Sequence, residues 1–143
     1  MAATETEYPH QDLTRAIIGG AFDVSNELGH GFSEAVNRSA LALVLRQNGL
    51  SVVEEQILRV LFRNQVIGTF YGDLVVEGVV LVEVKAAAAI EAYAEAQLLN
   101  YLKAAGGGVG LLLNFGRRVE YRRRVVGDPT NSLPVLRCNG LQM

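Results

Sequence analysis

The chain has 143 residues, a formal net charge of −2 and a single cysteine; 50% of its residues are hydrophobic and 20% are charged. This length suits one domain, which buries roughly two-thirds of the surface of the extended chain. The composition excludes an internal disulfide and a cysteine-rich zinc site. The longest apolar run is too short and too rich in glycine to span a bilayer, and a net charge near zero gives no overall electrostatic case for binding nucleic acid.

The balance of apolar and charged residues bears on association and location. So much apolar surface on a small domain indicates self-association into a homo-oligomer. Ala and Gly inflate the apolar count, however, and a core of small residues is the alternative. The segment 1–11 is polar and acidic, so we expect a flexible tail and no signal peptide. The single Cys138 fits a reducing cytoplasm.

Two helices are predicted in the first third of the chain. Apolar residues at spacings of three and four predict a helix over 12–28. A second helix follows with Ser33 as its N-cap, and Gly49 stands where a glycine commonly follows a helix. The adjacent Gly19 and Gly20 weaken the first helix by roughly 1 kcal/mol each. Such a pair is more tolerable where another backbone packs closely.

Strands dominate the remainder of the chain, with one helix among them. The predicted strands cover 51–62, as one bent strand or two short ones, and 66–76, 79–85, 109–113 and 119–126. Turns are predicted at Asn64–Gln65 and Glu77–Gly78, a helix over 90–105 and an irregular tail over 127–143. The helical crossover between strands 79–85 and 109–113 predicts a parallel pair of strands. We therefore expect one α/β (α+β) domain over 12–126, with a mixed central sheet flanked by helices.

Three charged residues interrupt an otherwise apolar hairpin. Glu83 and Lys85 are two apart on one strand, so their side chains share a face. Asp73, on the preceding strand, joins that face only if the turn near Gly78 has an odd number of residues or a bulge. An even turn without a bulge points Asp73 away from Glu83. Convergence of the three charges is therefore a prediction about one turn.

Two neighbouring carboxylates and a lysine form a minimal set of groups for metal-dependent hydrolysis of a phosphodiester. Adjacent carboxylates raise each other's pKa unless a cation intervenes, and Mg²⁺ binds through one or two carboxylates and several waters. The ion lowers the pKa of a bound water and stabilises charge on a phosphoryl oxygen, while a lysine orients that water or neutralises the transition state. Without convergence, the same residues are ordinary surface charges on a hairpin.

A basic segment lies near the C-terminus. It contains Arg117, Arg118, Arg122, Arg123 and Arg124. Their charge can bind the phosphates of a nucleic acid, or it can protect the edge of a sheet against aggregation. Both interpretations stay open, and Arg117, Arg118 and Arg122 are the candidate contacts to nucleic acid.

Further motifs flank the hairpin in a recognisable order. Gly31-Phe32-Ser33-Glu34 follows the first predicted helix, Gln97-x-x-x-Tyr101 lies in the third, and 109–116 reads Val-Gly-Leu-Leu-Leu-Asn-Phe-Gly. This order, over about 12–126, resembles the GxxExxY family of small bacterial and archaeal proteins, which is similar to the PD-(D/E)XK nuclease superfamily. The glutamine–tyrosine pair also resembles the Q-x-x-x-Y motif of RecB-like nucleases. The resemblance implies a restriction-endonuclease-like core and a nuclease that uses Mg²⁺ or Mn²⁺.

The resemblance also implies roles for individual residues. Asp73 and Glu83 would be metal ligands, and Lys85 would position the attacking water. Glu34 would approach the metal from the start of the second helix, although a first-turn acid that complements the helix dipole is the alternative.

The predicted third helix carries a second pair of candidates. Gln97 and Tyr101 lie four apart on one helix face, where the resemblance implies that they orient Lys85 or contact the scissile phosphate. The alternative is a polar edge on a core helix. The chain departs from the family at several positions. Asn37 replaces the eponymous tyrosine, no arginine or proline comes shortly before Asp73, and Ala94 stands where relatives often carry histidine.

Three functions remain open from the sequence. The first is a metal-dependent nuclease that hydrolyses DNA or RNA. The second is a self-assembling scaffold, oligomeric or filament-forming, on the same fold, which the apolar composition and the departures at Asn37 and Ala94 favour. The third is an accessory subunit that binds nucleic acid without cleaving it.

Overall fold

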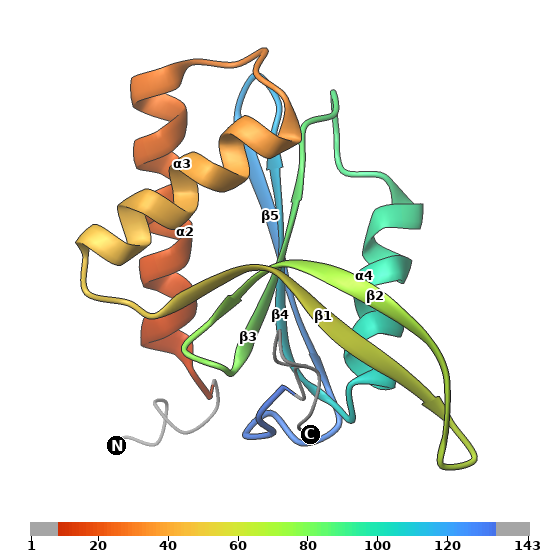
Figure 1. Cartoon of the computed structure of the whole chain (residues 1–143). Coiled ribbons are helices and arrows are strands. Elements are labelled where there is room, and N and C mark those ends of the chain that lie inside the picture. The colour runs from red at the N-terminus through yellow and green to blue at the C-terminus, as the bar shows by residue number, and fades with distance from the viewer. Residues whose placement is uncertain (1–8, 134–143) are drawn as a thin grey trace, which may run out of the picture.

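The computed structural model describes residues 9–133, so 1–8 and 134–143, including Cys138, lie outside the described residues. A central sheet separates two helices on one face from a single helix on the other (Figure 1). The helices are α2 (Gln11–Leu28), α3 (Glu34–Gln47) and α4 (Ala92–Ala104), with α2 and α3 together on the face opposite α4.

The sheet has five strands in the order β1-β2-β3-β4-β5. They are β1 (Val52–Phe62), β2 (Gln65–Val76), β3 (Val80–Lys85), β4 (Gly108–Phe115) and β5 (Val119–Val126). β3 and β4 run parallel with α4 as the crossover between them, and all other neighbouring strands are antiparallel. The predicted mixed sheet of an α+β domain is confirmed. Because β3 and β4 are parallel, their carboxyl ends lie side by side at one end of the strands, which we call the carboxyl edge of the sheet.

The ends of the first two helices follow from local sequence. α2 begins at Gln11, one residue before the predicted start. At α3 the Ser33 hydroxyl accepts the Val36 N–H at 3.2 Å, as predicted for an N-cap. Gly49 follows the C-cap of α3 with φ of 91°, a left-handed conformation that glycine adopts without steric cost. No helix in residues 9–133 is long and apolar enough to cross a membrane.

The glycine pair in α2 marks where the helix meets α3. A Cβ atom on Gly20 would lie 2.9 Å from Leu45 Cδ2 and 3.3 Å from Leu41 Cδ1, whereas Gly19 has no atom within 4 Å of that position. Gly20 therefore lets the two helices approach closely. Gly19 weakens α2 but makes no close contact that requires a glycine.

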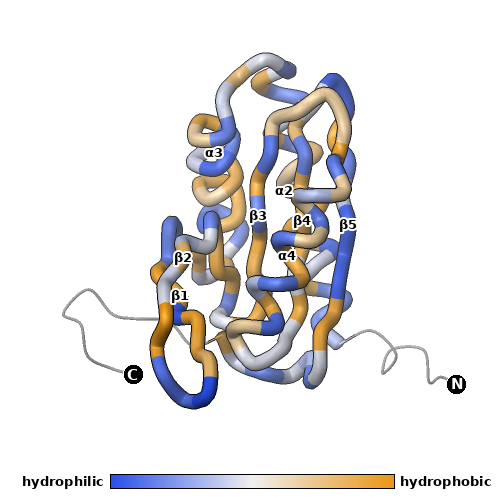
Figure 2. Tube along the Cα trace, turned by 90° about the vertical axis from the view of Figure 1, so that its right-hand side faces the viewer, coloured by the Kyte–Doolittle hydropathy of each residue, from blue (hydrophilic) through white to orange (hydrophobic). Residues whose placement is uncertain are grey.

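The sheet carries a core on each face. β4 is buried at all eight residues, because α2 and α3 cover one of its faces and α4 covers the other. The edge strand β5 is hydrophilic along much of its length (Figure 2). This contrast matches the continuous apolar run predicted for a doubly covered strand.

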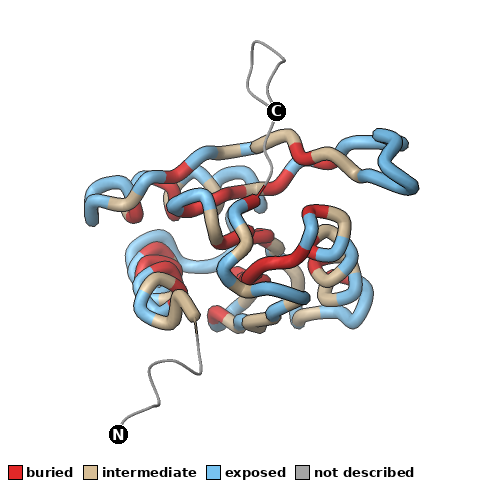
Figure 3. Tube along the Cα trace, turned by 90° about the horizontal axis from the view of Figure 1, so that it is seen from below, coloured by how far each residue is buried: buried red, intermediate tan, exposed pale blue. Residues whose placement is uncertain are grey.

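β1 and β2 form a long ribbon that leaves the body of the domain. β1 is one bent strand, and Glu55 has φ of 50° within it. The turn consists of Arg63 and Asn64, both at positive φ, so β2 begins at Gln65, one position earlier than predicted. The outer part of the ribbon is exposed and projects beyond α4 (Figures 1 and 3).

The segment after β5 has no helix or strand over 127–133, but it packs against the domain. Leu133 is buried in the core on the α4 face, and its N–H donates to the Gly78 carbonyl at 3.0 Å. The Asn131 side chain donates to the Gly107 carbonyl at 2.7 Å. The irregular region predicted to start at 127 therefore begins as a packed segment of the domain.

Replacing Gly20 with valine tests the contact between α2 and α3. Gly20→Val should lower the free energy of unfolding by about 1–3 kcal/mol, because the added methyl groups overpack a filled space. Gly19→Val should be nearly neutral, because valine is a slightly better helix former than glycine. Urea unfolding followed by circular dichroism measures both changes. Equal losses in the two variants would contradict the close approach at Gly20.

Candidate active site

The turn between β2 and β3 has three residues, 77–79. Glu77 and Gly78 both have positive φ, at 54° and 71°. Val76 pairs with Val80 across the turn, and the ladder continues to Leu74 and Val82. The odd turn that convergence requires is thus confirmed, and the next facing positions along the two strands are Asp73 and Glu83.

At Asp73 and Glu83 the two strands are joined through side chains. Asp73 Oδ2 accepts the Val84 N–H at 2.7 Å, and Glu83 Oε2 accepts the Asp73 N–H at 3.2 Å. The regular ladder between β2 and β3 ends one pair earlier. Each carboxylate therefore accepts a backbone hydrogen from the strand opposite, which holds the two acids side by side.

Burial makes both acids reluctant to ionise. Glu83 is only 5% exposed, and this burial, with the charge of Asp73, raises its pKa to about 8. Burial also raises the pKa of Asp73, although the Val84 N–H and the cations Arg38 and Lys85 oppose the shift. Of these two acids, Glu83 is buried and Asp73 is half-buried, and a cation beside them would stabilise their charged forms.

Lys85 is held from the α4 side. Its Nζ donates to Gln97 Oε1 at 3.4 Å. One turn further along α4, Tyr101 stacks on Phe70 of β2, with ring centroids 3.8 Å apart and planes at 12°. Burial raises the pKa of Tyr101, and the charge of nearby Glu83 adds to the shift. The predicted pair of Gln97 and Tyr101 therefore lies beside the acids and the lysine.

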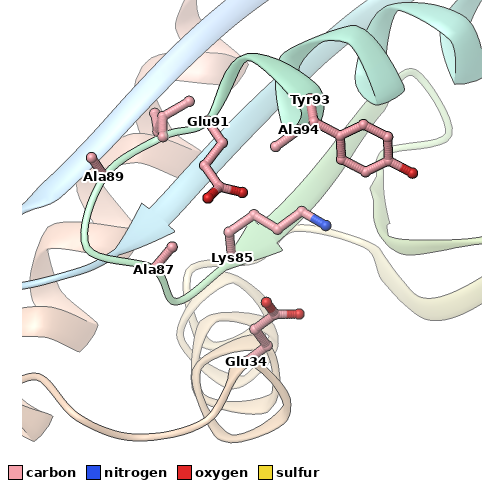
Figure 4. A pocket seen from close by; sticks show the side chains of 8 residues that line it. Glu34, Lys85, Ala87, Ala89, Glu91, Tyr93 and Ala94 are labelled. Carbon is pink, nitrogen blue, oxygen red and sulfur yellow. The ribbon is translucent and has the colours of Figure 1, made fainter.

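Glu34 faces this group across a cavity. The cavity has a volume of about 250 Å³ and is lined by Glu34, Lys85, Glu91 and Tyr93, among others (Figure 4). Glu34 is exposed at the start of α3. In residues 9–133 no three or more His, Cys, Asp or Glu side chains are grouped to hold a metal ion. Glu34 as a metal ligand stays a prediction.

The donor set of Asp73 and Glu83 fits a divalent cation of the magnesium type. Mg²⁺ keeps several waters and needs only one or two carboxylates from a protein. The two acids are adjacent and largely buried, and their pKa values are raised, so a divalent cation beside them would favour their ionised forms. These residues therefore suit Mg²⁺ or Mn²⁺ with water completing the shell.

Arg117 and Arg118 lie in the turn after β4, at the carboxyl edge of the sheet, as Lys85 does. Arg117 lines a second cavity of about 240 Å³ with Phe32 and with Ala86 and Ala88 of the loop that follows Lys85. The alternate residues of this loop, 87 and 89, line the cavity of Glu34. The two cavities thus flank one loop.

The other arginines of the basic segment lie on β5 and make contacts within the domain. Arg122 lies two strands away from Lys85 and donates to the Tyr121 carbonyl. Arg124 pairs with Glu95 of α4, and Arg123 donates to the Pro9 carbonyl. The structure brings Arg117 and Arg118 to the edge of the site and leaves Arg122 away from it.

Two residues at the site were not singled out from sequence. Arg38 of α3 pairs with Asp73, with 3.8 Å between Nη1 and Oδ1. Asn114, buried in β4, binds Ala87 through two hydrogen bonds and so anchors the loop after Lys85. The available signals were the position of Arg38, one helical turn after Glu34, and a single polar residue in an apolar strand.

Asn37 and Ala94, where the resembled family carries other residues, have different surroundings. Asn37 is buried, and its Nδ2 donates to the carbonyls of Phe32 and Ser33, so it braces the start of α3. Ala94 lines the cavity of Glu34 and Lys85 (Figure 4). A histidine at that position would reach into the cavity, whereas the alanine offers no functional group there.

Together these features define a nuclease-like α+β domain. Two acids lie on the adjacent strands β2 and β3, and a lysine lies at the carboxyl end of β3 in a mixed sheet. A family model described as the PD-(D/E)XK nuclease superfamily matches residues 11–125, and the chain belongs to this superfamily. The match runs from α2 into β5, so it includes every element that builds the site. No curated protein and no solved structure matches the chain.

The raised pKa of Glu83 predicts a dependence of stability on pH without metal. The folded protein holds this proton up to about pH 8, whereas the unfolded chain releases it near pH 4.5. The proton on Glu83 therefore stabilises the folded state fully below about pH 4.5, and this contribution is lost as pH rises from there through about 8. In EDTA, the free energy of unfolding of the wild type relative to Glu83→Gln should fall by up to about 1.4 kcal/mol per pH unit.

Glutamine is the matched replacement because its carbonyl can still accept the Asp73 N–H. Urea titrations of both proteins across this pH range give the difference directly. A difference that stays constant with pH would show that Glu83 is ionised throughout.

Proposed function

We propose that the protein is a metal-dependent nuclease that hydrolyses phosphodiester bonds of DNA or RNA. The observation that carries this proposal is the reciprocal hydrogen bonding of Asp73 and Glu83 beside Lys85. A surface hairpin has no need of two adjacent acids on facing strands, one buried and one half-buried. A site for a cation and a phosphate does need them.

The residues divide the work between binding and positioning. Asp73 and Glu83 would hold Mg²⁺ or Mn²⁺, which supplies a water of lowered pKa and stabilises charge on the phosphoryl oxygens. Lys85, oriented by Gln97, donates a hydrogen bond to the attacking water or to the developing negative charge. Tyr101, fixed against Phe70, keeps the α4 side of the site in place.

Three further residues would act around this centre. Glu34 lies across the cavity from Lys85, so it would reach the cation through a bridging water. Arg117 and Arg118 are exposed at the carboxyl edge of the sheet, where they would bind backbone phosphates of the nucleic acid. Arg122 would contribute at most to a longer substrate that extends along β5.

Replacing Lys85 tests the nuclease activity. With Mg²⁺ or Mn²⁺, the wild type should cleave at least one of single- or double-stranded DNA or RNA. Lys85→Ala should reduce the rate by about 10²–10³-fold, the usual effect of removing one group that stabilises the transition state. Lys103→Ala, an exposed lysine in the last turn of α4, should leave the rate unchanged. Gel assays with end-labelled substrates measure all three proteins.

The outcomes of this assay separate the alternatives. Cleavage that survives in Lys85→Ala would belong to a contaminant or another site and would contradict the proposal. Binding without cleavage that weakens steeply with salt would instead indicate an accessory subunit that binds nucleic acid.

We also propose self-association as a homo-oligomer, because the outer ribbon of β1 and β2 is apolar and exposed. Leu61, Phe62, Val66 and Ile67 are 54%, 57%, 50% and 63% exposed. β1 is an edge strand of eleven residues, and its outer backbone is open to another strand. The opposite edge, β5, carries the arginines that block such pairing. A second copy of the chain, pairing through β1, fits this edge.

A charge on the ribbon should break the oligomer. Light scattering after size exclusion should give a dimer or larger particle for the wild type and a monomer for the double variant Leu61→Lys, Ile67→Lys, because strand pairing would bury these charges. Leu43→Lys, on an equally exposed leucine of α3, is the control and should leave the mass unchanged. A monomeric wild type would refute self-association.

A further inference from the structure

Asp73 has one partner on each of its carboxylate oxygens. Oδ2 accepts the Val84 N–H at 2.7 Å, and Oδ1 lies 3.8 Å from Arg38 Nη1. The hydrogen bond to Val84 is part of the junction of β2 and β3. Oδ1 is therefore the oxygen that Asp73 can offer to a metal ion, and an arginine of α3 already stands beside it.

Arg38 is shared among three acids. Its Nη2 lies 3.7 Å from Glu55 Oε2 and its Nε lies 4.0 Å from Glu54 Oε1, while the whole side chain is 18% exposed. These distances are longer than those of direct charge-assisted hydrogen bonds, about 2.7–2.9 Å. The Nε atom is buried and has no hydrogen-bond partner within residues 9–133. The guanidinium is held by charge and is not locked onto one acid.

The bend in β1 brings the other two acids to this place. Glu54 pairs with Leu74 and Gln56 pairs with Gly72, so Glu55 lies opposite Asp73 and outside the ladder. Its φ of 50° is uncommon for a residue other than glycine. Arg38 thus lies between Asp73 of the site and a pair of acids just outside it.

We propose that Arg38 is the resident counter-cation of Asp73, that it competes with the divalent metal ion for Oδ1, and that Glu54 and Glu55 receive its guanidinium when the metal binds. This inference rests on the metal site of the proposed function. Two cations at one carboxylate oxygen repel each other, so the metal ion enters only as Arg38 moves away. Arg38 is a positioning residue that sets the metal concentration at which the site fills.

The acceptors make the exchange feasible. Moving a guanidinium from one acid to an adjacent pair of acids keeps its charge compensated, whereas releasing it into an apolar environment would not. Glu55 is exposed and Glu54 is half-buried, and Arg46 already binds Glu54 Oε2 at 3.1 Å. Because Glu54 is already paired with Arg46, we expect Glu55 to form the main ion pair with Arg38 after the metal ion binds.

The decisive measurement is the affinity for Mn²⁺ alone, by isothermal titration calorimetry at fixed pH and low salt. Arg38→Gln should bind Mn²⁺ about tenfold more tightly than the wild type, because one like charge at ion-pair distance has been removed. Glu55→Gln should bind more weakly, because Arg38 then stays with Asp73. Arg15→Gln is the control, because it removes an exposed arginine of α2, and its affinity should not change.

The two variants of opposite sign keep the inference open to refutation. Unchanged or weaker binding in Arg38→Gln would overturn it, and so would tighter binding in Glu55→Gln. Absence of Mn²⁺ binding in both the wild type and Arg38→Gln would also overturn it. If Arg38→Gln fails to fold, the exposed Glu55→Gln change still decides. The opposite shifts in affinity without any cleavage of nucleic acid would support this role of Arg38 while rejecting the nuclease.

Discussion

The site depends on hydrogen bonds to two acidic side chains, which take the place of backbone hydrogen bonds where the ladder between β2 and β3 ends. Asp73 and Glu83 each accept a backbone N–H from across the junction. These bonds supply the partners that buried acids need, and they satisfy two amide groups at the point where the ladder stops. Two acids are thereby fixed side by side in an apolar sheet, with raised pKa values as the physical consequence.

Packing of α4 on β4 and contacts from β4 position Lys85 beside this junction. A Cβ on Gly110 would lie 2.8 Å from Leu98 Cδ1, so the glycine lets α4 approach β4 closely. That approach is what places Gln97 within reach of Lys85. On β4, Asn114 ties down the loop after Lys85. The lysine is therefore positioned from the helix, from the neighbouring strand and from its own strand.

Periodicity was sufficient to predict the helices and strands, but it did not predict the geometry of the turns or the contacts between elements. The strand over 119–126 was predicted with its observed bounds, since alternation and flanking turns are local signals. The parity of the β2–β3 turn could be posed only as a condition, because it depends on Glu77 adopting a left-handed conformation that no pattern announces. Arg38 was missed because its role depends on the bend at Glu55, a tertiary feature.

The distribution of charge resolves an apparent conflict between a net charge of −2 and a nuclease fold. Much of the basic segment is used within the domain, since Arg123 and Arg124 bind Pro9 and Glu95. The acids of the site are likewise compensated locally, by Arg38 and Lys85. Within the basic segment, Arg117 and Arg118 stay exposed at the end of the sheet where Lys85 ends its strand. Attraction of phosphate therefore depends on where a few charges lie, and the sum over the chain does not measure it.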